Sequence, residues 1–243
     1  MNNKTSTLKA THKNYRHVFF DLDHTLWDFD ANAKESLLEV YDHFDLPSMT
    51  AIAFTNFYSI YLRHNSILWD RYHKGFITSE DLKWKRMCRT LLECSIGDEL
   101  LAKNMGAKFL EILPTKKLLF DYTIEILEYL QQKKYSIHLI TNGFEKTQLS
   151  KLNNSNLAKY FAHVITSEGS NAVKPAKEIF EFAILKAEAN QNESIMIGDN
   201  PEADIQGAIN AGIDSVFVNH TKIEIALEPT YTIFNLRELE EIL

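Results

Sequence analysis

Short apolar runs separated by amphipathic segments limit the possible folds of this chain more than any other feature. The first run, HVFFDLD at His17–Asp23, is almost continuously apolar and ends in carboxylates, which is typical of a buried central strand. Further apolar runs lie at Ser136–Thr141, His163–Thr166, Ser194–Gly198, Asp214–Val218 and Tyr231–Phe234. Helical patterns lie at Tyr122–Lys133, Glu145–Asn153, Lys177–Ala189 and Glu202–Ala211. This alternation predicts an α/β fold with a mostly parallel sheet covered on both faces.

The stretch from residue 31 to residue 112 breaks the alternation. Its helix-like patterns lie at Lys34–His43, Ala53–Arg71, Ser79–Leu92 and Asp98–Ile112, without a convincing strand between them. We expect this stretch to form a separate helical cap, inserted into a core of residues 1–30 and 113–243. Because the insertion follows the first strand, it should leave the core near the carboxyl end of that strand, where open α/β sheets bind ligands. The cap is therefore expected to act as a lid over the site.

The charge of the chain argues against a nucleic-acid polymer as its partner. Basic residues number 26 and acidic residues 33, which gives a net charge of −7 and repels a phosphate backbone. Small phosphorylated molecules stay possible, since a cation and a few local donors can reverse the field inside one pocket.

The sequence indicates neither a membrane protein nor a secreted one. Its apolar runs are far shorter than the roughly 20 residues that cross a bilayer, and the start of the chain lacks the apolar centre of a secretory signal. We therefore expect a cytoplasmic protein, with a polar and mobile tail before Tyr15. The two cysteines, Cys88 and Cys94, fall six residues apart in one predicted helix. They are poorly placed for a disulfide and too few for a zinc cluster, so a packing role is expected.

Two carboxylates follow the first strand directly. Asp21 and Asp23 are separated by one residue, so both can reach the same crevice where the strand ends. Close carboxylates repel and raise each other's proton affinity unless a cation or a proton lies between them. The same pattern also occurs at turns and helix caps, so the pair alone leaves both interpretations open.

A second group of polar residues follows the strand at Ser194–Gly198. Asp199 and Asn200 come next, and Asp204 lies on the first turn of the following helix. Asp199 is placed to supply a hard oxygen ligand to magnesium, and Asp204 could orient Asp199 or bound waters without binding the ion itself. The alternative is that Asp199 or Asn200 only caps the helix. Carboxylates at the ends of two strands favour the magnesium site.

Two further segments offer what an anionic substrate requires. Thr141, Asn142 and Gly143 lie between a strand and a helix, where a hydroxyl, an amide and backbone N–H groups can bind phosphate oxygens. Lys174 and Pro175 precede another helix, so that the proline stiffens the helix entry and the lysine brings a positive charge to the site. Each segment alone is an ordinary turn, but their order and spacing relative to the carboxylates favour a phosphate site.

Taken together, these segments resemble the haloacid dehalogenase-like hydrolase superfamily over essentially the whole chain after its N-terminal tail. The matching segments, in order, are DLDHTL at Asp21–Leu26, TNG at Thr141–Gly143, Lys174–Pro175, and Gly198–Asp199 with Asp204. The resemblance implies a doubly wound, Rossmann-like core with an all-helical cap inserted after the first motif.

The resemblance also implies a role for each matching residue. Asp21 would attack phosphorus to give an aspartyl-phosphate, and Asp23 would protonate the leaving alcohol and then activate water. Mg²⁺ would bind the carboxylates of Asp21 and Asp199 and the backbone carbonyl of Asp23. Thr141 and Lys174 would hold the transferring phosphoryl group, and the lysine would also steady the nucleophile.

Asp23 separates branches of this superfamily, because members that displace halide from carbon have no alkoxide to protonate. The chain resembles the phosphatases, and phosphomutases share the aspartate pair. The stretches FFDLDHTLWDFDANAKESL and GDNPEADIQGAINAGIDSVFVN look most like bacterial house-cleaning pyrimidine 5′-nucleotidases. This subgroup implies a small phosphorylated metabolite, a nucleoside 5′-monophosphate, as substrate. The expected assembly is a monomer or a weak homodimer.

Alternatives to a nucleotidase stay open. One is a phosphatase of another metabolite, such as a sugar phosphate or phosphoglycolate, or a phosphomutase; the other is an inactive binding protein, although the nucleophile, the lysine and the metal ligands are all in place. Cap residues should select the leaving group, and the candidates are Trp69, Tyr72, Trp84 and Arg86, although aromatic residues at helical spacing usually pack a bundle. His24 could shape the pocket or only pack against the backbone.

Overall fold

The computed structural model describes residues 13–243 of the chain. They form two compact units. The first runs to Leu26 and continues over Phe120–Asn142 and Lys159–Leu243, and the second comprises Trp27–Leu119 and Gly143–Ala158. Most of the N-terminal tail that we expect to be mobile lies outside the described residues.

The first unit is built on a parallel sheet. The strands found in the described residues are β1 His17–Phe20, β2 Ser136–Thr141, β3 His163–Thr166, β4 Ser194–Gly198, β5 Asp214–Val218 and β6 Tyr231–Ile233. They lie in the order β3-β2-β1-β4-β5-β6, and every neighbouring pair is parallel. The chain moves outward from β1 to β3 and then returns to the other side of β1, so β1 and β4 flank the switch point of a doubly wound sheet. The predicted fold class is confirmed.

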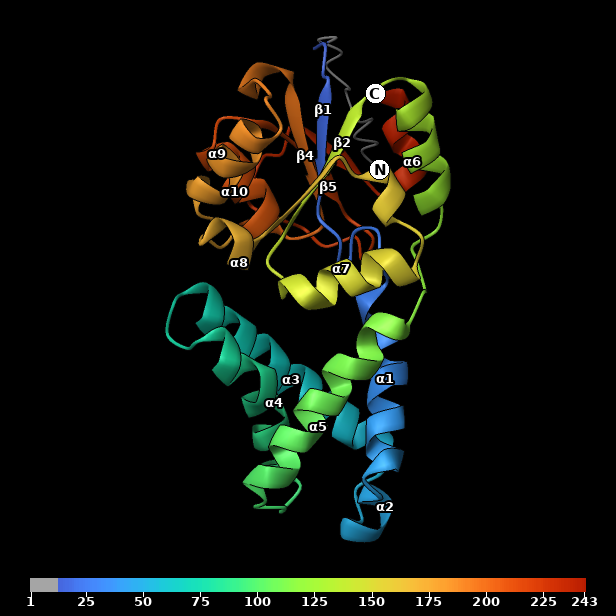
Figure 1. Ribbon diagram of the computed structural model, residues 1–243, viewed down its shortest axis with the longest axis vertical. Coiled ribbons are helices and arrows are strands. Elements are labelled where there is room, and N and C mark those ends of the chain that lie inside the picture. Colours follow the sequence, from blue (N-terminus) through green and yellow to red (C-terminus); the bar gives the residue numbers. More distant parts are fainter. Residues whose placement is uncertain (1–12) are drawn as a thin grey trace, which may run out of the picture. The chain divides into compact units, whose positions relative to one another are not determined.

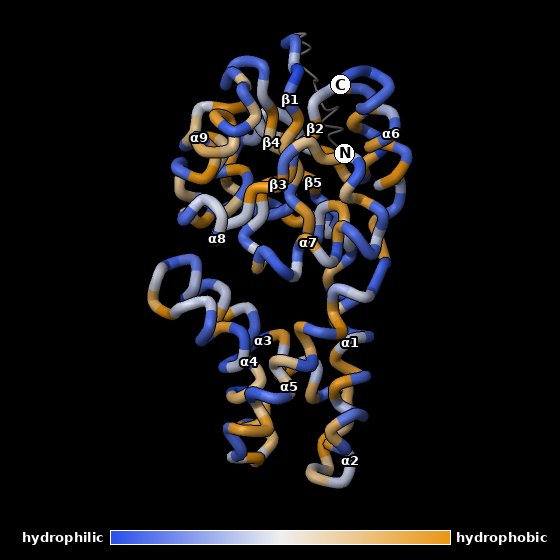
Figure 2. The backbone as a smooth tube through the Cα atoms, in the orientation of Figure 1, coloured by the Kyte–Doolittle hydropathy of each residue, from blue (hydrophilic) through white to orange (hydrophobic). Residues whose placement is uncertain are grey.

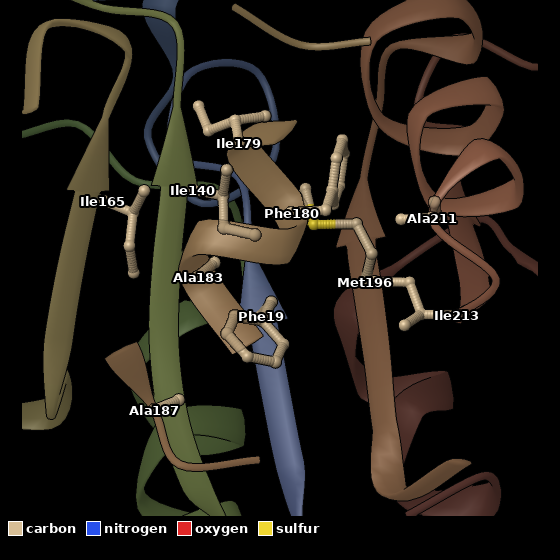
Figure 3. Packing of buried hydrophobic residues seen from close by; sticks show 11 residues of the cluster. Phe19, Ile140, Ile165, Ile179, Phe180, Ala183, Ala187, Met196, Ala211 and Ile213 are labelled. Atoms are coloured by element: carbon tan, nitrogen blue, oxygen red, sulfur yellow. The ribbon is translucent and has the colours of Figure 1, made fainter. Parts of the chain in front are cut away.

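Helices cover both faces of this sheet (Figure 1). α9 Lys177–Lys186 and α10 Gly207–Asn210 lie on one side, and α6 Thr123–Gln132 and the C-terminal 3₁₀ helix η5 Leu236–Glu241 lie on the other. Because side chains alternate along a strand, Phe19 faces α9 while its neighbours Val18 and Phe20 face the opposite layer. Figure 3 shows the apolar cluster under α9 and α10, which consists of Phe19, Ile140, Ile165, Ile179, Phe180, Ala183, Ala187, Met196, Ala208, Ala211 and Ile213.

Most elements of this unit lie where the sequence predicts them. β2, β3, β4 and β5 have the expected bounds, whereas β1 and β6 end earlier than expected. The helix expected at Glu202–Ala211 is instead the π-helical turn η4 Pro201–Gln206 followed by α10. The cause is a shared acceptor: the Asn200 carbonyl accepts from the backbone N–H groups of Asp204 at 2.9 Å and Ile205 at 3.3 Å. The short helices α8 Ser167–Ser170, η2 Ala158–Tyr160 and η3 Gln191–Glu193 complete the connections.

The second unit is helical. Its elements are α1 Phe29–His43, α2 Leu46–Met49, α3 Phe54–His73, α4 Ser79–Glu93, α5 Glu99–Ile112, η1 Leu113–Thr115 and α7 Glu145–Asn154. Three of these helices begin at the side chains that favour helix starts, since Asp28, Thr78 and Asp98 accept a hydrogen bond from a backbone N–H in the first turn of α1, α4 and α5. At Gly106 of α5 a Cβ would lie 2.8 Å from the Lys83 carbonyl oxygen, so the glycine lets α5 approach α4 closely.

α7 makes its contacts with the helical unit. Asn154 Nδ2 donates to the Pro114 carbonyl at 2.8 Å, and Lys151 Nζ lies 4.3 Å from the ring centre of Trp27. This segment falls within residues 113–243, which we predict to belong to the core, and that assignment stays a prediction. The domain boundaries at residues 30 and 113 likewise stay a prediction.

Hydropathy follows this architecture. Figure 2 shows hydrophobic residues concentrated along the strands, while hydrophobic and hydrophilic residues alternate along the outer helices. Within residues 13–243, each helix is too short or too polar to cross a membrane. Cys88 in α4 and Cys94 at the end of α4 are free thiols, and Cys94 is buried as a packing residue.

Candidate active site

The neighbouring strands β1 and β4 bring two aspartates to one edge of the sheet. Phe20 pairs with Ile197 in register, and the pairing continues one residue further because the Asp21 backbone N–H donates to the Ile197 carbonyl at 2.9 Å. Asp199 follows β4 directly. One carboxylate oxygen from each of Asp21, Asp199 and Asp204 lies within 4.8 Å of the other two. The two strand ends that the sequence singled out therefore meet at the switch point of the sheet.

A buried lysine lies among these carboxylates. Lys174 Nζ donates to Asp21 Oδ1 at 2.6 Å, to Asp204 Oδ1 at 2.6 Å and to the Ile140 carbonyl at 2.9 Å. The side chain is 2% exposed, and these acceptors use its three N–H groups. Three carboxylates and one ammonium leave a formal charge of −2 in the cluster when all are ionised.

Asn142 holds the backbone of Lys174. Its Oδ1 accepts from the Lys174 N–H at 2.8 Å, and its Nδ2 donates to the Lys174 carbonyl at 3.0 Å. We predict that Asn142 offers its amide to phosphate; in the structure both polar atoms of that side chain contact the backbone of Lys174, and a part in phosphate binding stays a prediction. Phosphate binding through the backbone N–H groups of this segment stays a prediction.

Thr25 holds Asp199 in a similar way. The Thr25 hydroxyl donates to Asp199 Oδ1 at 3.0 Å and accepts from the Asp199 backbone N–H at 3.1 Å. Sequence reasoning missed this contact, since a threonine after a carboxylate pair carries no signal about which strand end it meets. Asn200, and not Asp199, caps the following helix: its Oδ1 accepts from the backbone N–H groups of Glu202 and Ala203.

Gly198 makes room for Asp204. A Cβ at position 198 would lie 2.2 Å from Asp204 Oδ2, which no side chain can tolerate. That same oxygen accepts from the Asn200 N–H at 3.0 Å. Glycine is therefore required at the end of β4 so that Asp204, carried by η4, can reach Lys174.

The remaining predicted site residues lie around this cluster or outside its unit. Thr141 ends β2 and is 2% exposed, next to the Ile140 carbonyl that Lys174 contacts. Asp23 lies two residues beyond Asp21, and its charge contributes to the raised pKa of Asp21. Gly143 belongs to the helical unit, where a Cβ would lie 2.5 Å from the Gln148 side chain, and its part in phosphate binding stays a prediction.

Burial and mutual repulsion shift the proton affinities in the cluster. Burial raises the pKa of Asp21 to about 7; Lys174 opposes the shift, whereas Asp204 and Asp23 add to it. Burial, with the charges of Asp204 and Asp21, also raises the pKa of Asp199 well above its ordinary value. Burial alone would lower the pKa of Lys174, but the carboxylates of Asp204 and Asp21 outweigh it and raise that pKa, so the ammonium stays charged.

The donor set fits a small divalent cation. Hydrogen bonds engage Oδ1 of Asp21 and Oδ1 of Asp199, which leaves Oδ2 of each without a donor among residues 13–243. Both oxygens of Asp204 accept hydrogen bonds, from Lys174 and from the Asn200 N–H. Carboxylate oxygens are the ligands that Mg²⁺ prefers, and its two charges would balance the −2 of the cluster.

Comparison with known proteins agrees with this arrangement. The pyrimidine 5′-nucleotidase PynA of Streptococcus pneumoniae is 28% identical over 232 residues, covering 94% of this chain and 95% of that protein. The pyrimidine 5′-nucleotidase YjjG of Escherichia coli is 30% identical over 232 residues, covering 93% of this chain and 96% of that protein. The crystal structure of the hydrolase YfnB from Bacillus subtilis bound to magnesium matches with a TM-score of 0.86 at 28% identity, covering 95% of this chain and 99% of that one.

The family match extends across both strand ends that carry the carboxylates. It covers residues 18–218, from β1 to the end of β5, and so includes every motif on which the resemblance rested. The protein therefore belongs to the haloacid dehalogenase-like hydrolase family.

Proposed function

We propose that this chain is a Mg²⁺-dependent phosphatase that uses the Asp21 carboxylate as its nucleophile. The observation that carries the proposal is the convergence of Asp21, Asp199 and Asp204 around the buried Lys174. Phosphoryl transfer needs positioned charge more than elaborate covalent chemistry. This cluster holds the Asp21 carboxylate, the Lys174 ammonium, and the Oδ2 atoms of Asp21 and Asp199, which accept no hydrogen bond from the described residues.

The proposed reaction has two steps. First, an Asp21 oxygen forms a bond to phosphorus as the ester P–O bond breaks, and Asp23 gives its proton to the leaving alcohol oxygen. Asp23 then takes a proton from water, whose oxygen attacks phosphorus, so that the Asp21–phosphorus bond breaks and inorganic phosphate leaves. Lys174 favours the ionised form of Asp21 against its burial, and with Thr141 it would hold the phosphoryl oxygens.

Asp21 and Asp199 would hold the metal, together with the backbone carbonyl of Asp23. When bound, Mg²⁺ would neutralise charge on the transferring phosphoryl group. Asp204 would act through Lys174, since its two oxygens already accept hydrogen bonds.

For the substrate we propose a nucleoside 5′-monophosphate with a pyrimidine base. The support is the similarity, over more than nine tenths of both chains, to two proteins that are pyrimidine 5′-nucleotidases. A screen of phosphate release with Mg²⁺ should compare ribo- and deoxynucleotides with sugar phosphates and phosphoglycolate. If sugar phosphates turn over far faster than every nucleotide, the nucleotidase proposal is lost and the phosphatase proposal stands. If phosphate moves to another hydroxyl of the substrate instead of into solution, the enzyme is a mutase.

The nucleophile is tested by Asp21→Asn, with the exposed Asp42→Asn of α1 as a matched control. Asp21→Asn should abolish phosphate release, because an amide is a poor nucleophile, while Asp42→Asn should keep it. Acid quenching with labelled substrate should trap phosphate on the wild-type chain and not on Asp21→Asn. Full activity of Asp21→Asn, or full activity after magnesium is chelated, would refute the mechanism.

A further inference from the structure

The hydroxyl of Thr25 makes one donated and one accepted hydrogen bond, both with the same residue of the site. It donates its proton to Asp199 Oδ1 at 3.0 Å and accepts the Asp199 backbone N–H at 3.1 Å. Thr25 is 0% exposed, so water does not reach the hydroxyl from its own side, while Asp199 is half-buried. Its rotation is fixed from both sides, and it therefore fixes the plane of the Asp199 carboxylate relative to the end of β4.

This contact limits how Asp199 can bind a cation. With Oδ1 committed to the hydroxyl, only Oδ2 is without a donor among the described residues, so the carboxylate is prepared for binding through one oxygen. Asp21 is limited in the same way by Lys174, and both oxygens of Asp204 are engaged. No carboxylate of the cluster within the described part of the chain has both oxygens available.

Such a site discriminates between divalent cations. Ca²⁺ takes six to eight oxygen ligands and commonly binds carboxylates through both oxygens, whereas Mg²⁺ takes six ligands at short distances and keeps several waters. We propose that Thr25 is a positioning residue that sets the metal preference of this site for Mg²⁺ over Ca²⁺ by withholding one oxygen of Asp199. This inference rests on the proposed function, in which the cluster holds a magnesium ion.

Among the contacts that restrict the carboxylates, the one from Thr25 can be removed without a change of charge. Substitution of Lys174 would alter the electrostatics of the whole cluster, and the donor to Asp204 Oδ2 is a backbone N–H. Thr25→Val keeps the shape of the side chain and removes the hydroxyl. Thr25→Ser keeps the hydroxyl and removes a methyl group, so it is the matched control. Thr25→Ala removes the hydroxyl without the bulk of valine and serves as a second variant where Thr25→Val fails to fold.

The experiment is a calorimetric titration of chelator-treated protein with Mg²⁺ alone and with Ca²⁺ alone, without substrate. We expect Thr25→Val to lose about tenfold or more in Mg²⁺ affinity, the usual cost of removing a group that orients a metal ligand. Its Ca²⁺ affinity should stay the same or rise, because Oδ1 becomes free, so its preference for Mg²⁺ should fall about tenfold or more. Thr25→Ser should keep the wild-type preference, and Thr25→Ala should behave as Thr25→Val does.

Each outcome decides one question. If Thr25→Val or Thr25→Ala is folded and keeps the wild-type ratio of the two affinities, Thr25 only packs the strand end and the inference is overturned. If Thr25→Ser loses the ratio as well, the methyl group and not the hydroxyl is responsible, which also overturns it. If the wild-type protein binds neither cation and releases phosphate from no substrate, the proposed function itself fails, independently of Thr25.

Discussion

Lys174 is held at both ends of its side chain. Asp21 and Asp204 accept from its ammonium, and Asn142 clamps its backbone on both sides of the α-carbon. A long side chain pays a high entropic cost when it is fixed, and here the fold meets that cost with buried hydrogen bonds. The ammonium is thus kept beside Asp21 before any substrate arrives, which is what electrostatic preorganisation requires.

The closest packing in the site gives the first prediction, at Gly198. Gly198→Ala should push Asp204 away from Lys174, because the new Cβ would lie 2.2 Å from Asp204 Oδ2. We expect a loss of about 1–3 kcal/mol in the free energy of unfolding, as for other overpacked sites, and a loss of at least about tenfold in kcat. Chemical denaturation and steady-state kinetics measure both quantities.

Gly97→Ala is the control for Gly198→Ala. Nothing lies within 4 Å of a Cβ built at Gly97, so the same added methyl group meets open space there. The free energy of unfolding of this variant should lie within about 0.5 kcal/mol of the wild-type value. Wild-type kinetics in Gly198→Ala would show that Asp204 does not need its present position.

At the scale of elements, the parts that could be predicted from the sequence are those with strong local signals. β2 to β5 were predicted with their observed bounds because short apolar runs between polar turns leave little choice of register. The π-helical η4 could not be predicted, because it depends on one carbonyl, that of Asn200, accepting two N–H groups. The contact of Thr25 with Asp199 could not be predicted either, because it joins the segment after β1 to the segment after β4, which are far apart in the sequence.

The amino ends of three strands carry a histidine stack that gives the second prediction. His138 of β2 stacks on His17 of β1 and His163 of β3, with ring centres 5.4 Å apart in each case, and it also stacks on Phe19. Burial, with the charges of His17 and His163, lowers the pKa of His138 from 6.5 to about 4. Between these pH values the unfolded chain takes up a proton that the folded chain refuses. Stability should therefore fall as the pH drops through this window, by about 2 kcal/mol after allowance for solvent screening.

His138→Phe tests this origin, since it keeps the stacking and removes the titrating group. Its free energy of unfolding should depend less on pH between 6.5 and about 4 than that of the wild type, as followed by urea denaturation at several pH values. A part of the slope should stay, because burial also lowers the pKa of His17. His43→Gln changes an exposed histidine and should keep the full slope. If the free energy of unfolding of His138→Phe depends on pH as strongly as that of the wild type, His138 is not the cause of the pH dependence.

The helical unit contains a buried guanidinium that gives the third prediction. Arg86 of α4 is 2% exposed; its Nη1 donates to Asn65 Oδ1 at 3.1 Å, and the group lies 5.2 Å from the Phe109 ring centre. Nε and Nη2 have no hydrogen-bond partner in the described part of the chain. Burying a charge with unsatisfied donors is costly. The free energy of unfolding of Arg86→Met should therefore equal or exceed that of the wild type.

Arg86→Ala should separate packing from charge. It leaves a cavity among α3, α4 and α5, and should be less stable than Arg86→Met by about 2–4 kcal/mol in thermal or chemical unfolding. If Arg86→Met instead loses more than about 2 kcal/mol, the guanidinium contributes a favourable interaction beyond the two contacts above. A role of Arg86 in leaving-group selection stays a prediction.

At the scale of the whole molecule, the active site is a region where the protein gives up stability. The chain carries a net charge of −7, and the buried cluster adds three carboxylates against a single lysine. The raised pKa values of Asp21 and Asp199 mean that their ionised forms destabilise the folded state at neutral pH. The sequence could predict that Asp21 and Asp199 lie at neighbouring strand ends and that Lys174 accompanies Asp21, but not that Asp204 accepts from the same lysine.

The last prediction follows from this opposition between function and stability. Because the folded-state pKa of Asp199 is raised, the unfolded chain releases that proton at a lower pH, and stability is lost as the pH rises toward neutral. Asp199→Asn removes the charge, keeps an oxygen that can accept from Thr25, and adds an N–H near the other carboxylates. Without metal it should melt above the wild type, by about 2–4 °C for each kcal/mol gained.

The same variant should lose the response to metal. Mg²⁺ binds the folded wild type and should raise its melting temperature with increasing concentration, whereas Asp199→Asn, which lacks a charged ligand, should show little or no rise. Asp42→Asn, on an exposed surface of α1, should melt like the wild type and keep the full magnesium response. If Asp199→Asn melts below the wild type in the absence of metal, the carboxylate is stabilised by its neighbours rather than strained by them. Since charge repulsion in the empty cluster is what a divalent ion would relieve, that result would weaken the metal assignment as well as the stability argument.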